Sequence, residues 1–203
     1  MIKDKTFIID LDNTIISTIE SIINLNNKLY PSKYVQFNKQ FDWFLKPMIN
    51  SEEELSELFK LFDHKDFYKD VIVYDNAIEI INELAEDNRV VICSKHSEKR
   101  KPITTAWINK TMPKVEIVFV DNFEDKGKVF DNVFMVIDDK IDCLDSFDND
   151  VYKICFGNYV WNQESNDVRC CSWLEVKRRI ECIERMENST IQFKMEYEST
   201  WYK

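Results

Sequence analysis

The feature that most constrains this chain is the stretch FIIDLDNTII, residues 7–16, in which an apolar run is interrupted by polar residues and then resumes. The residues before the interruption are β-branched and aromatic, which is typical of a buried strand. Burying an unpaired carboxylate costs a large free energy, so two carboxylates are rarely placed there for packing alone. Asp10 and Asp12 therefore either cap a turn at the end of a strand or bind a ligand.

Apolar runs alternate with amphipathic segments along most of the chain. The pattern predicts strands at residues 5–10, 89–94, 114–120, 132–138 and 151–157, and helices at 75–87, 101–112, 140–147 and 172–187. Strands that alternate with helices indicate an α/β fold with a parallel sheet wound on both sides. The length of 203 residues fits either one domain of ordinary size or a core with a smaller inserted lobe.

The inserted lobe is predicted directly after the first strand. A helix at residues 17–30 is followed by an irregular aromatic-rich segment, and a second helix starts at Ser51 with acidic residues in its first turn. We therefore expect a Rossmann-like core of residues 1–16 and 72–203 and a small helical cap of residues 17–71. The tail from residue 190 onward is interpreted as either an extra strand or a loose end.

Composition excludes several classes of function. Acidic residues outnumber basic ones by 37 to 27, so the formal charge is −10, and such a surface repels long nucleic acids and anionic membranes. No secretory signal or membrane-spanning run is visible, and the six cysteines include no CxxC pair, which favours a reduced, cytoplasmic protein. With only two glycines, the chain has neither a Walker loop nor a GxGxxG fingerprint.

Conspicuous polar residues follow three of the predicted strands. The first strand ends in Asp10 and Asp12, the second in Ser94, and the fourth in the pair Asp138-Asp139. Because the carboxyl ends of parallel strands meet at one edge of a sheet, these side chains are expected to converge on one ligand. Helix capping is the alternative for the acidic pair, and a plain strand end is the alternative for Ser94.

This ordered set resembles the haloacid dehalogenase (HAD)-like phosphohydrolases. Their first motif, DxDxT/V after a buried strand, is matched by DLDNT at residues 10–14, the second by Ser94, and the fourth by VIDD at residues 136–139. The order of the motifs and the FGNYVWN stretch near the end resemble the 5'(3')-deoxyribonucleotidase group, seen in phage and bacteria as well as animals. The resemblance spans nearly the whole chain.

The resemblance implies a role for each of these residues. Asp10 would attack phosphorus and form an aspartyl-phosphate, and Asp12 would protonate the leaving oxygen and then activate water. Mg²⁺ would be held by Asp10, the backbone carbonyl of Asp12 and Asp139, with Asp138 in close support. Ser94 would bind the phosphate oxygens.

The sequence does not decide which lysine serves as the third motif. Lys101 precedes Trp107 in the segment where relatives place it, and Lys126 lies before the fourth motif. Thr104 or Thr105 occupies the position nearest to the expected one, and Lys101 is slightly favoured over Lys126. The run Lys99-Arg100-Lys101 is otherwise typical of a solvated face, and His96 of a polar loop.

The cap aromatics Phe41, Trp43 and Phe44 are candidates for stacking on a nucleobase, with ordinary packing as the alternative. We therefore predict a Mg²⁺-dependent phosphatase of deoxyribonucleoside monophosphates, with a small nucleotide as its partner and a homodimer as a possible assembly. Two rival functions are a polynucleotide 3'-phosphatase, which a basic groove beside Asp10 would favour, and a phosphate- or nucleotide-binding protein without turnover.

Overall fold

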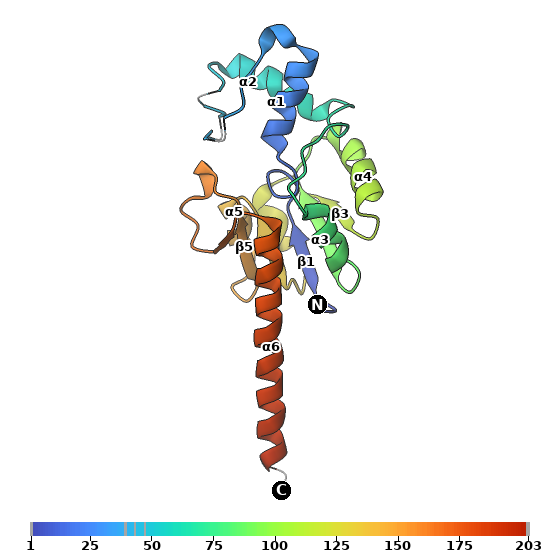
Figure 1. The fold of residues 1–203 in the computed structure, drawn as a ribbon, viewed down its shortest axis with the longest axis vertical. Coiled ribbons are helices and arrows are strands. Elements are labelled where there is room, and N and C mark those ends of the chain that lie inside the picture. Colours follow the sequence, from blue (N-terminus) through green and yellow to red (C-terminus); the bar gives the residue numbers. More distant parts are fainter. Residues whose placement is uncertain (1, 39, 43, 47, 202–203) are drawn as a thin grey trace.

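A six-stranded, wholly parallel sheet forms the centre of the molecule in a computed structural model (Figure 1). Residues 2–38, 40–42, 44–46 and 48–201 are described, with side chains through residue 189. Across the sheet the strands run in the order β3 (Glu116–Phe119), β2 (Arg89–Ser94), β1 (Thr6–Ile9), β4 (Met135–Asp138), β5 (Tyr152–Phe156) and β6 (Val168–Cys170). The strand order reverses at β1, and such a switch point is where ligands bind in open α/β sheets.

The register of β1 with its two neighbours determines which side chains meet above the sheet. Ile9 pairs with Ile92 of β2 on one side and with Ile137 of β4 on the other. Asp10 directly follows β1, and Asp138 is the last residue of β4, so the two carboxylates leave the sheet side by side. Ser94 is the last residue of β2.

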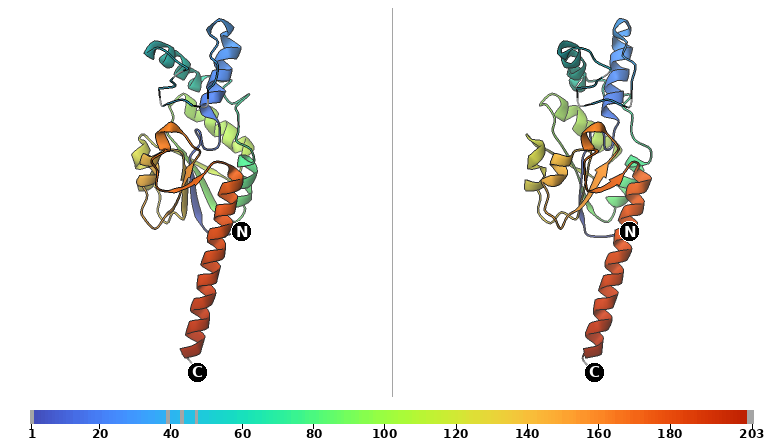
Figure 2. Two further views of the ribbon diagram at one scale, coloured as in Figure 1. Left: turned by 60° about the vertical axis from the view of Figure 1, so that its left-hand side comes forward. Right: turned by 90° about the vertical axis from the view of Figure 1, so that its left-hand side faces the viewer.

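Successive side chains along each strand point to opposite faces of the sheet and contribute to two apolar layers. Phe7 and Ile9 belong to a large cluster on one face, and Ile8 belongs to a smaller cluster on the other. The larger cluster includes residues of α3 (Ala77–Leu84), α4 (Arg100–Thr111) and α6 (Trp173–Trp201), and the smaller one residues of α5 (Ile141–Asp145). Helices on both faces of the sheet confirm the predicted α/β class (Figure 2).

The segment after β1 lies above the carboxyl end of the sheet (Figure 1). It contains α1 (Thr18–Leu29), α2 (Glu52–Phe59) and the short 3-10 helices η1 (Pro31–Lys33) and η2 (Lys60–Asp63). The chain leaves and re-enters the core at one place, where Ile16 and Val73 form an isolated antiparallel bridge and the Ser17 N–H donates to Ile72 O at 2.8 Å. Ser51 caps α2 by accepting from the Glu54 N–H at 3.1 Å.

The C-terminal helix α6 differs from the sequence prediction. Its first turns pack on the core through Trp173, Val176, Ile180 and Ile183, which are all buried, and it then continues away from the body (Figure 1). The interpretation of the tail as a strand or loose end is wrong, because the helix runs on to Trp201. Extending an existing helix gains one hydrogen bond per residue, and no proline or glycine interrupts this segment.

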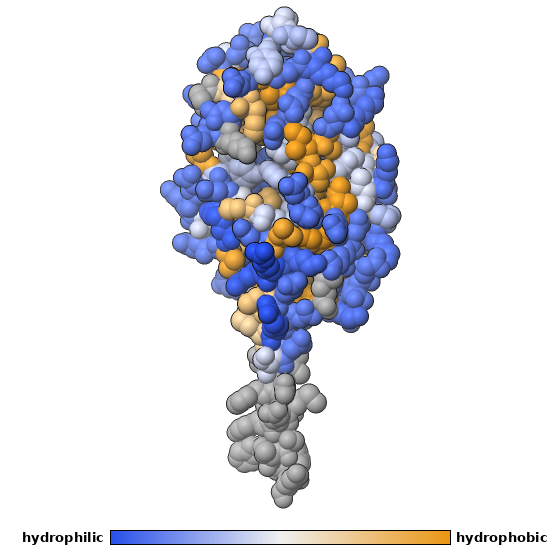
Figure 3. Space-filling view, viewed as in Figure 1, coloured by the Kyte–Doolittle hydropathy of each residue, from blue (hydrophilic) through white to orange (hydrophobic). Residues whose placement is uncertain are grey.

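Hydrophilic residues predominate on the face shown in Figure 3, and apolar residues gather in the middle of the body. Of the helices described between residues 2 and 201, none is both long and apolar enough to cross a membrane.

Candidate active site

The loop that follows β1 is a tight turn held from several sides. The carbonyl of Leu11 accepts from the N–H groups of Ile15 and Ile16 at 3.0 and 3.1 Å. Asn13 adopts a left-handed conformation (φ 59°), which asparagine tolerates better than most residues. The indole N–H of Trp173 donates to Thr14 O at 2.9 Å. These bonds fix the direction in which the two aspartates of the loop point.

Three carboxylates form a buried cluster at the edge of the sheet. Asp10, Asp138 and Asp139 each offer an oxygen within 4.8 Å of the others, and all three residues are buried. Lys126 lies among them, with its Nζ 2.5 Å from Asp10 Oδ1 and 2.7 Å from Asp138 Oδ2. The indole N–H of Trp161 donates to Asp139 Oδ2 at 3.0 Å. One lysine therefore faces three acids.

The excess of carboxylates over the single lysine shifts the pKa values of the residues in the cluster. Burial, opposed by Lys126, raises the pKa of Asp10 to about 7. Burial and the neighbouring charges of Asp10 and Asp138 raise the pKa of Asp139 well above its ordinary value. Burial disfavours the Lys126 ammonium, but Asp10 and Asp138 hold its pKa well above the ordinary value. A divalent cation bound to these oxygens would relieve the excess negative charge, and hard oxygen ligands suit Mg²⁺, so the residues present fit that ion.

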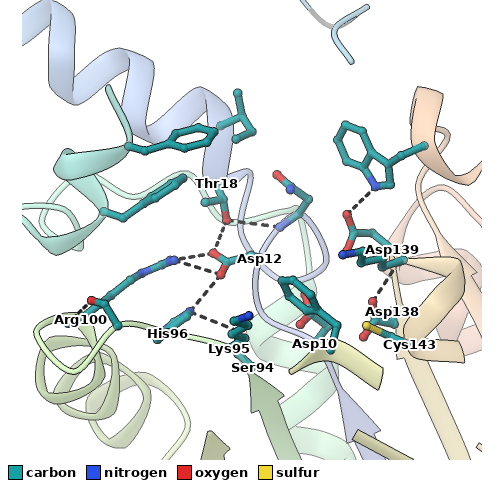
Figure 4. A pocket seen from close by; sticks show the side chains of 18 of the residues that line it. Asp10, Asp12, Thr18, Ser94, Lys95, His96, Arg100, Asp138, Asp139 and Cys143 are labelled. Carbon is teal, nitrogen blue, oxygen red and sulfur yellow. Dashed lines mark hydrogen bonds and ion pairs between the residues drawn. The ribbon is translucent and has the colours of Figure 1, made fainter. Parts of the chain in front are cut away.

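The second aspartate of the loop lies in a separate network (Figure 4). Arg100 donates to both carboxylate oxygens of Asp12, at 3.0 and 2.6 Å. His96 Nε2 lies 2.9 Å from Oδ2, and the Thr18 hydroxyl donates to Oδ1 at 2.6 Å. Burial alone would raise the pKa of Asp12, but Arg100 and His96 hold it well below its ordinary value. Asp12 is therefore ionised in this arrangement.

Ser94 and His96 connect the end of β2 to this network. Ser94 Oγ lies 3.2 Å from His96 Nε2, and Thr104 Oγ1 lies 3.0 Å from Nδ1. His96 is buried, and burial lowers its pKa. His96 lies in the loop after β2, as interpreted, but it is buried there: its Nε2 faces the Ser94 hydroxyl and the Asp12 carboxylate, and its Nδ1 faces the Thr104 hydroxyl.

A cavity of about 320 Å³ opens above the two networks. Its floor is polar and comes from the strand ends, whereas much of its upper wall is apolar and comes from the segment between β1 and α3. The floor includes Asp10, Asp12, Ser94, Lys126, Asp138 and Asp139, and the upper wall includes Ile19, Phe41, Leu45, Phe59 and Phe62. Such a cavity can hold a molecule with an anionic end and a flat apolar body.

A sequence profile described as "5' nucleotidase, deoxy (Pyrimidine), cytosolic type C protein" matches residues 4–186. The chain belongs to this NT5C family. It is a phosphatase with a HAD-like fold, as the motifs predicted. A search of curated proteins found no match.

Three solved structures with this fold have low sequence identity to the chain. A HAD-superfamily hydrolase of subfamily IA from Geobacter sulfurreducens has 12% identity and a TM-score of 0.55, covering 86% of this chain and 98% of its own. A HAD-like hydrolase from Streptococcus pneumoniae has 13% identity and a TM-score of 0.55, with coverages of 87% and 98%. A HAD hydrolase from Bacillus subtilis, solved with bound magnesium, has 11% identity and a TM-score of 0.56, with coverages of 89% and 100%.

In this NT5C-family chain, Lys126 and not Lys101 lies beside Asp10. Lys101 forms an ion pair with Glu98 at 2.5 Å and does not line the cavity. The slight preference for Lys101 as the lysine of the third motif is therefore corrected in favour of Lys126. Lys126 is directed inward by η3 (Phe123–Lys128), which approaches α5 so closely that a Cβ on Gly127 would lie 1.9 Å from Ser146 O. Only a glycine fits at that point of contact.

The three cap aromatics predicted to bind a base are in different positions. Phe41 lines the cavity and is buried, with its ring 5.5 Å from that of Trp161. Phe44 is 61% exposed and does not line the cavity, so its assignment to a base platform is wrong. Trp43 lies outside the described residues.

Sequence reasoning missed two residues that hold the site's carboxylates. Arg100 was interpreted as part of a solvated charge run, yet it is only 5% exposed and its guanidinium lies 5.0 Å from the rings of both Phe62 and Phe67. Nothing in the local sequence marks it, because its burial depends on rings about 35 residues away in the chain. Trp161 is part of the stretch that carried the family resemblance, but its contact with Asp139 was not predicted.

Proposed function

We propose that this chain is a Mg²⁺-dependent phosphatase of deoxyribonucleoside monophosphates that acts through an aspartyl-phosphate on Asp10. The observation that carries the proposal is the position of Asp10. Its carboxylate lies between Lys126 and two further buried acids, at the floor of a cavity whose upper wall is aromatic and apolar. The description of the matched family, a deoxy pyrimidine 5' nucleotidase, supports the choice of substrate.

Asp10, Asp138 and Asp139 would hold the metal ion, whose positive charge lets an anionic phosphate approach carboxylates. Lys126 adds a fixed positive charge beside the nucleophile. Ser94, at the end of β2, would donate its hydroxyl to a phosphate oxygen. These residues come from three adjacent strand ends and η3, so the sheet itself sets their spacing.

The reaction would proceed in two displacements. An oxygen of Asp10 attacks phosphorus, the ester P–O bond breaks, and the leaving oxygen takes a proton from Asp12. Water then attacks the phosphorus of the aspartyl-phosphate, Asp12 accepts the proton of that water, and the Asp10 carboxylate is regenerated as inorganic phosphate leaves. The first displacement requires Asp12 in its protonated form, so Asp12 must take up a proton before the ester bond breaks. The carboxylate form, which Arg100 and His96 favour in the free site, is the form that accepts the proton of water.

The nucleoside would occupy the apolar upper part of the cavity, where Phe41 and Phe62 offer ring surface. A 3'-phosphorylated polynucleotide end is a second candidate substrate. Lys95 and Lys140 both line the cavity and lie 5.1 and 3.7 Å from the ring of Phe123, and they could meet a further phosphate. The net charge of −10 opposes binding of a long polyanion.

A panel of phosphomonoesters distinguishes these functions. Phosphate release is measured from dUMP, dTMP, dGMP, UMP, a sugar phosphate and a 3'-phosphorylated oligonucleotide, with Mg²⁺ and with a chelator. We expect Mg²⁺-dependent release that is fastest from the deoxynucleotides. Release from the oligonucleotide alone would assign the chain to end repair, and nucleotide binding without release from any substrate would show a binding protein.

Replacing Phe41 by Ala tests the position of the base. Because stacking on an aromatic ring contributes about 1–3 kcal/mol, KM for deoxynucleotides is expected to rise at least about fivefold, with KM for a sugar phosphate nearly unchanged. Phe44→Ala is the matched control, since Phe44 is exposed and lies off the cavity. An equal rise for both substrates in Phe41→Ala would show that Phe41 only packs the cap.

A further inference from the structure

We infer that Trp161 is a positioning residue for the metal ion: its indole N–H holds the Asp139 carboxylate in the orientation that binds the cation. The inference rests on the proposed function, in which Asp139 is one of the ligands of Mg²⁺. It deepens that function by assigning a role to a residue outside the acidic cluster. Trp161 lies on the short 3-10 helix η4 (Val160–Asn162), in the segment that joins β5 to β6.

The donor to Asp139 differs in charge from the donor to the other two carboxylates. The Lys126 ammonium bonds Asp10 and Asp138, so its positive charge competes with a metal ion for both. The Trp161 indole N–H, which donates to Asp139 Oδ2 at 3.0 Å, is neutral. A neutral donor fixes the direction of a carboxylate without offsetting its negative charge, so Asp139 keeps that charge for the cation.

The main chain of Asp139 is held from the same turn. Asn162 Nδ2 donates to Asp139 O at 2.9 Å and to Phe156 O at 3.0 Å, and Asn162 is fully buried. Arg169 in turn donates to Asn162 Oδ1 at 2.8 Å. Two consecutive residues, Trp161 and Asn162, therefore fix the side chain and the main chain of Asp139 together.

The Trp161 ring is itself fixed by Tyr159. The two rings stack with their centroids 4.5 Å apart and an angle of 3° between their planes. The Tyr159 hydroxyl donates to Asn13 O at 2.8 Å, in the loop that follows β1. Gly157 (φ 77°) lies so close to Tyr159 that a Cβ at this position would be 2.4 Å from the ring. The stack therefore sets the direction of the indole N–H relative to the loop that carries the nucleophile.

Removing the indole N–H should weaken metal binding and leave the chemistry of the loaded site intact. Loss of an outer donor to a metal ligand typically lowers metal affinity by about 10–100-fold. Asp139 itself remains, so a high concentration of Mg²⁺ should fill the cluster and restore the rate. A merely structural role for Trp161 predicts a different pattern, in which activity is lost and excess Mg²⁺ does not restore it.

The test titrates Mg²⁺ alone, without nucleotide, into wild type and Trp161→Phe by isothermal titration calorimetry. Phenylalanine keeps an aromatic ring for the stack on Tyr159 but lacks the N–H. The dissociation constant for Mg²⁺ is expected to rise about tenfold or more, with kcat at saturating Mg²⁺ within about threefold of wild type. Trp107→Phe is the matched control, because Trp107 is half-buried and stacks on Tyr68 but does not line the cavity.

Trp161→Leu also lacks the N–H and serves where Trp161→Phe does not fold. An unchanged dissociation constant for Mg²⁺ in a folded variant would overturn the inference. An equal rise in Trp107→Phe, or a loss of kcat that excess Mg²⁺ does not restore, would overturn it too. Because the titration contains no nucleotide, its result is independent of the substrate. If the dissociation constant rises as expected but the wild type releases no phosphate, the inference stands and the proposed function fails.

Discussion

Replacing Asp10 by Asn is expected to abolish Mg²⁺-dependent phosphate release, lowering kcat by at least about a thousandfold, as removal of a nucleophile does in other covalent enzymes. The amide has nearly the same volume and can still accept a hydrogen bond from Lys126, so packing at the end of β1 is preserved. What is lost is the anionic oxygen that attacks phosphorus and one of the three charges available to the metal ion. The measurement is the initial rate of phosphate release from a deoxynucleotide at saturating Mg²⁺.

Asp145→Asn is a suitable control for this variant, because Asp145 is exposed on α5 and does not line the cavity. Its rate should equal that of the wild type. Substantial turnover by a folded Asp10→Asn variant would contradict the role of Asp10 as nucleophile.

Replacing Lys126 by Met is expected to reduce both activity and stability. Lys126 is 1% exposed and bonds two carboxylates, and its removal leaves three buried acids without a cation. Breaking a buried ion pair from one side typically costs about 3–5 kcal/mol, so the free energy of unfolding in the absence of Mg²⁺ should fall by about that amount. Urea denaturation measures this change. Because the positive charge beside Asp10 is lost, kcat is also expected to fall at least about a hundredfold.

Lys101→Met provides the matched comparison, because Lys101 was the other candidate for the same role. Its ion pair with Glu98 is on the surface, and such pairs contribute about 0–1 kcal/mol, so stability and activity should change little. The account of the site is wrong if Lys101→Met loses activity while Lys126→Met retains it. Mg²⁺ should also stabilise Lys126→Met more than wild type, because without the competing ammonium group the carboxylates of the folded cluster bind the cation more tightly.

The parts of the site that the sequence predicted share one property. Asp10, Ser94 and the Asp138-Asp139 pair each follow an apolar run, and the parallel sheet brings the ends of those runs to one edge. Periodicity is a local signal, and the predicted carboxyl ends of these three strands lie within one residue of the observed ones. The three-residue strand β6 was not predicted, because a run that short has no period to distinguish it from a loop.

The parts that the sequence did not predict depend on contacts between distant segments. The choice between Lys126 and Lys101 depends on the close approach of Gly127 to Ser146. The burial of Arg100 depends on Phe62 and Phe67, which close over it from the segment above the sheet. Charge runs are usually solvated, so composition alone placed Arg100 on the surface. The division of the chain into a core and a cap at residues 17–71 stays a prediction.

The most direct test of the central claim is the capture of a phosphoryl group on the enzyme. Wild type and Asp10→Asn are mixed with a deoxynucleotide and Mg²⁺, quenched in acid, digested, and analysed by mass spectrometry. The account predicts the added mass of one phosphoryl group on Asp10 of the wild type and no phosphoryl group on the Asp10→Asn variant. A phosphoryl group on any other residue, or none in an enzyme that turns over, would contradict it.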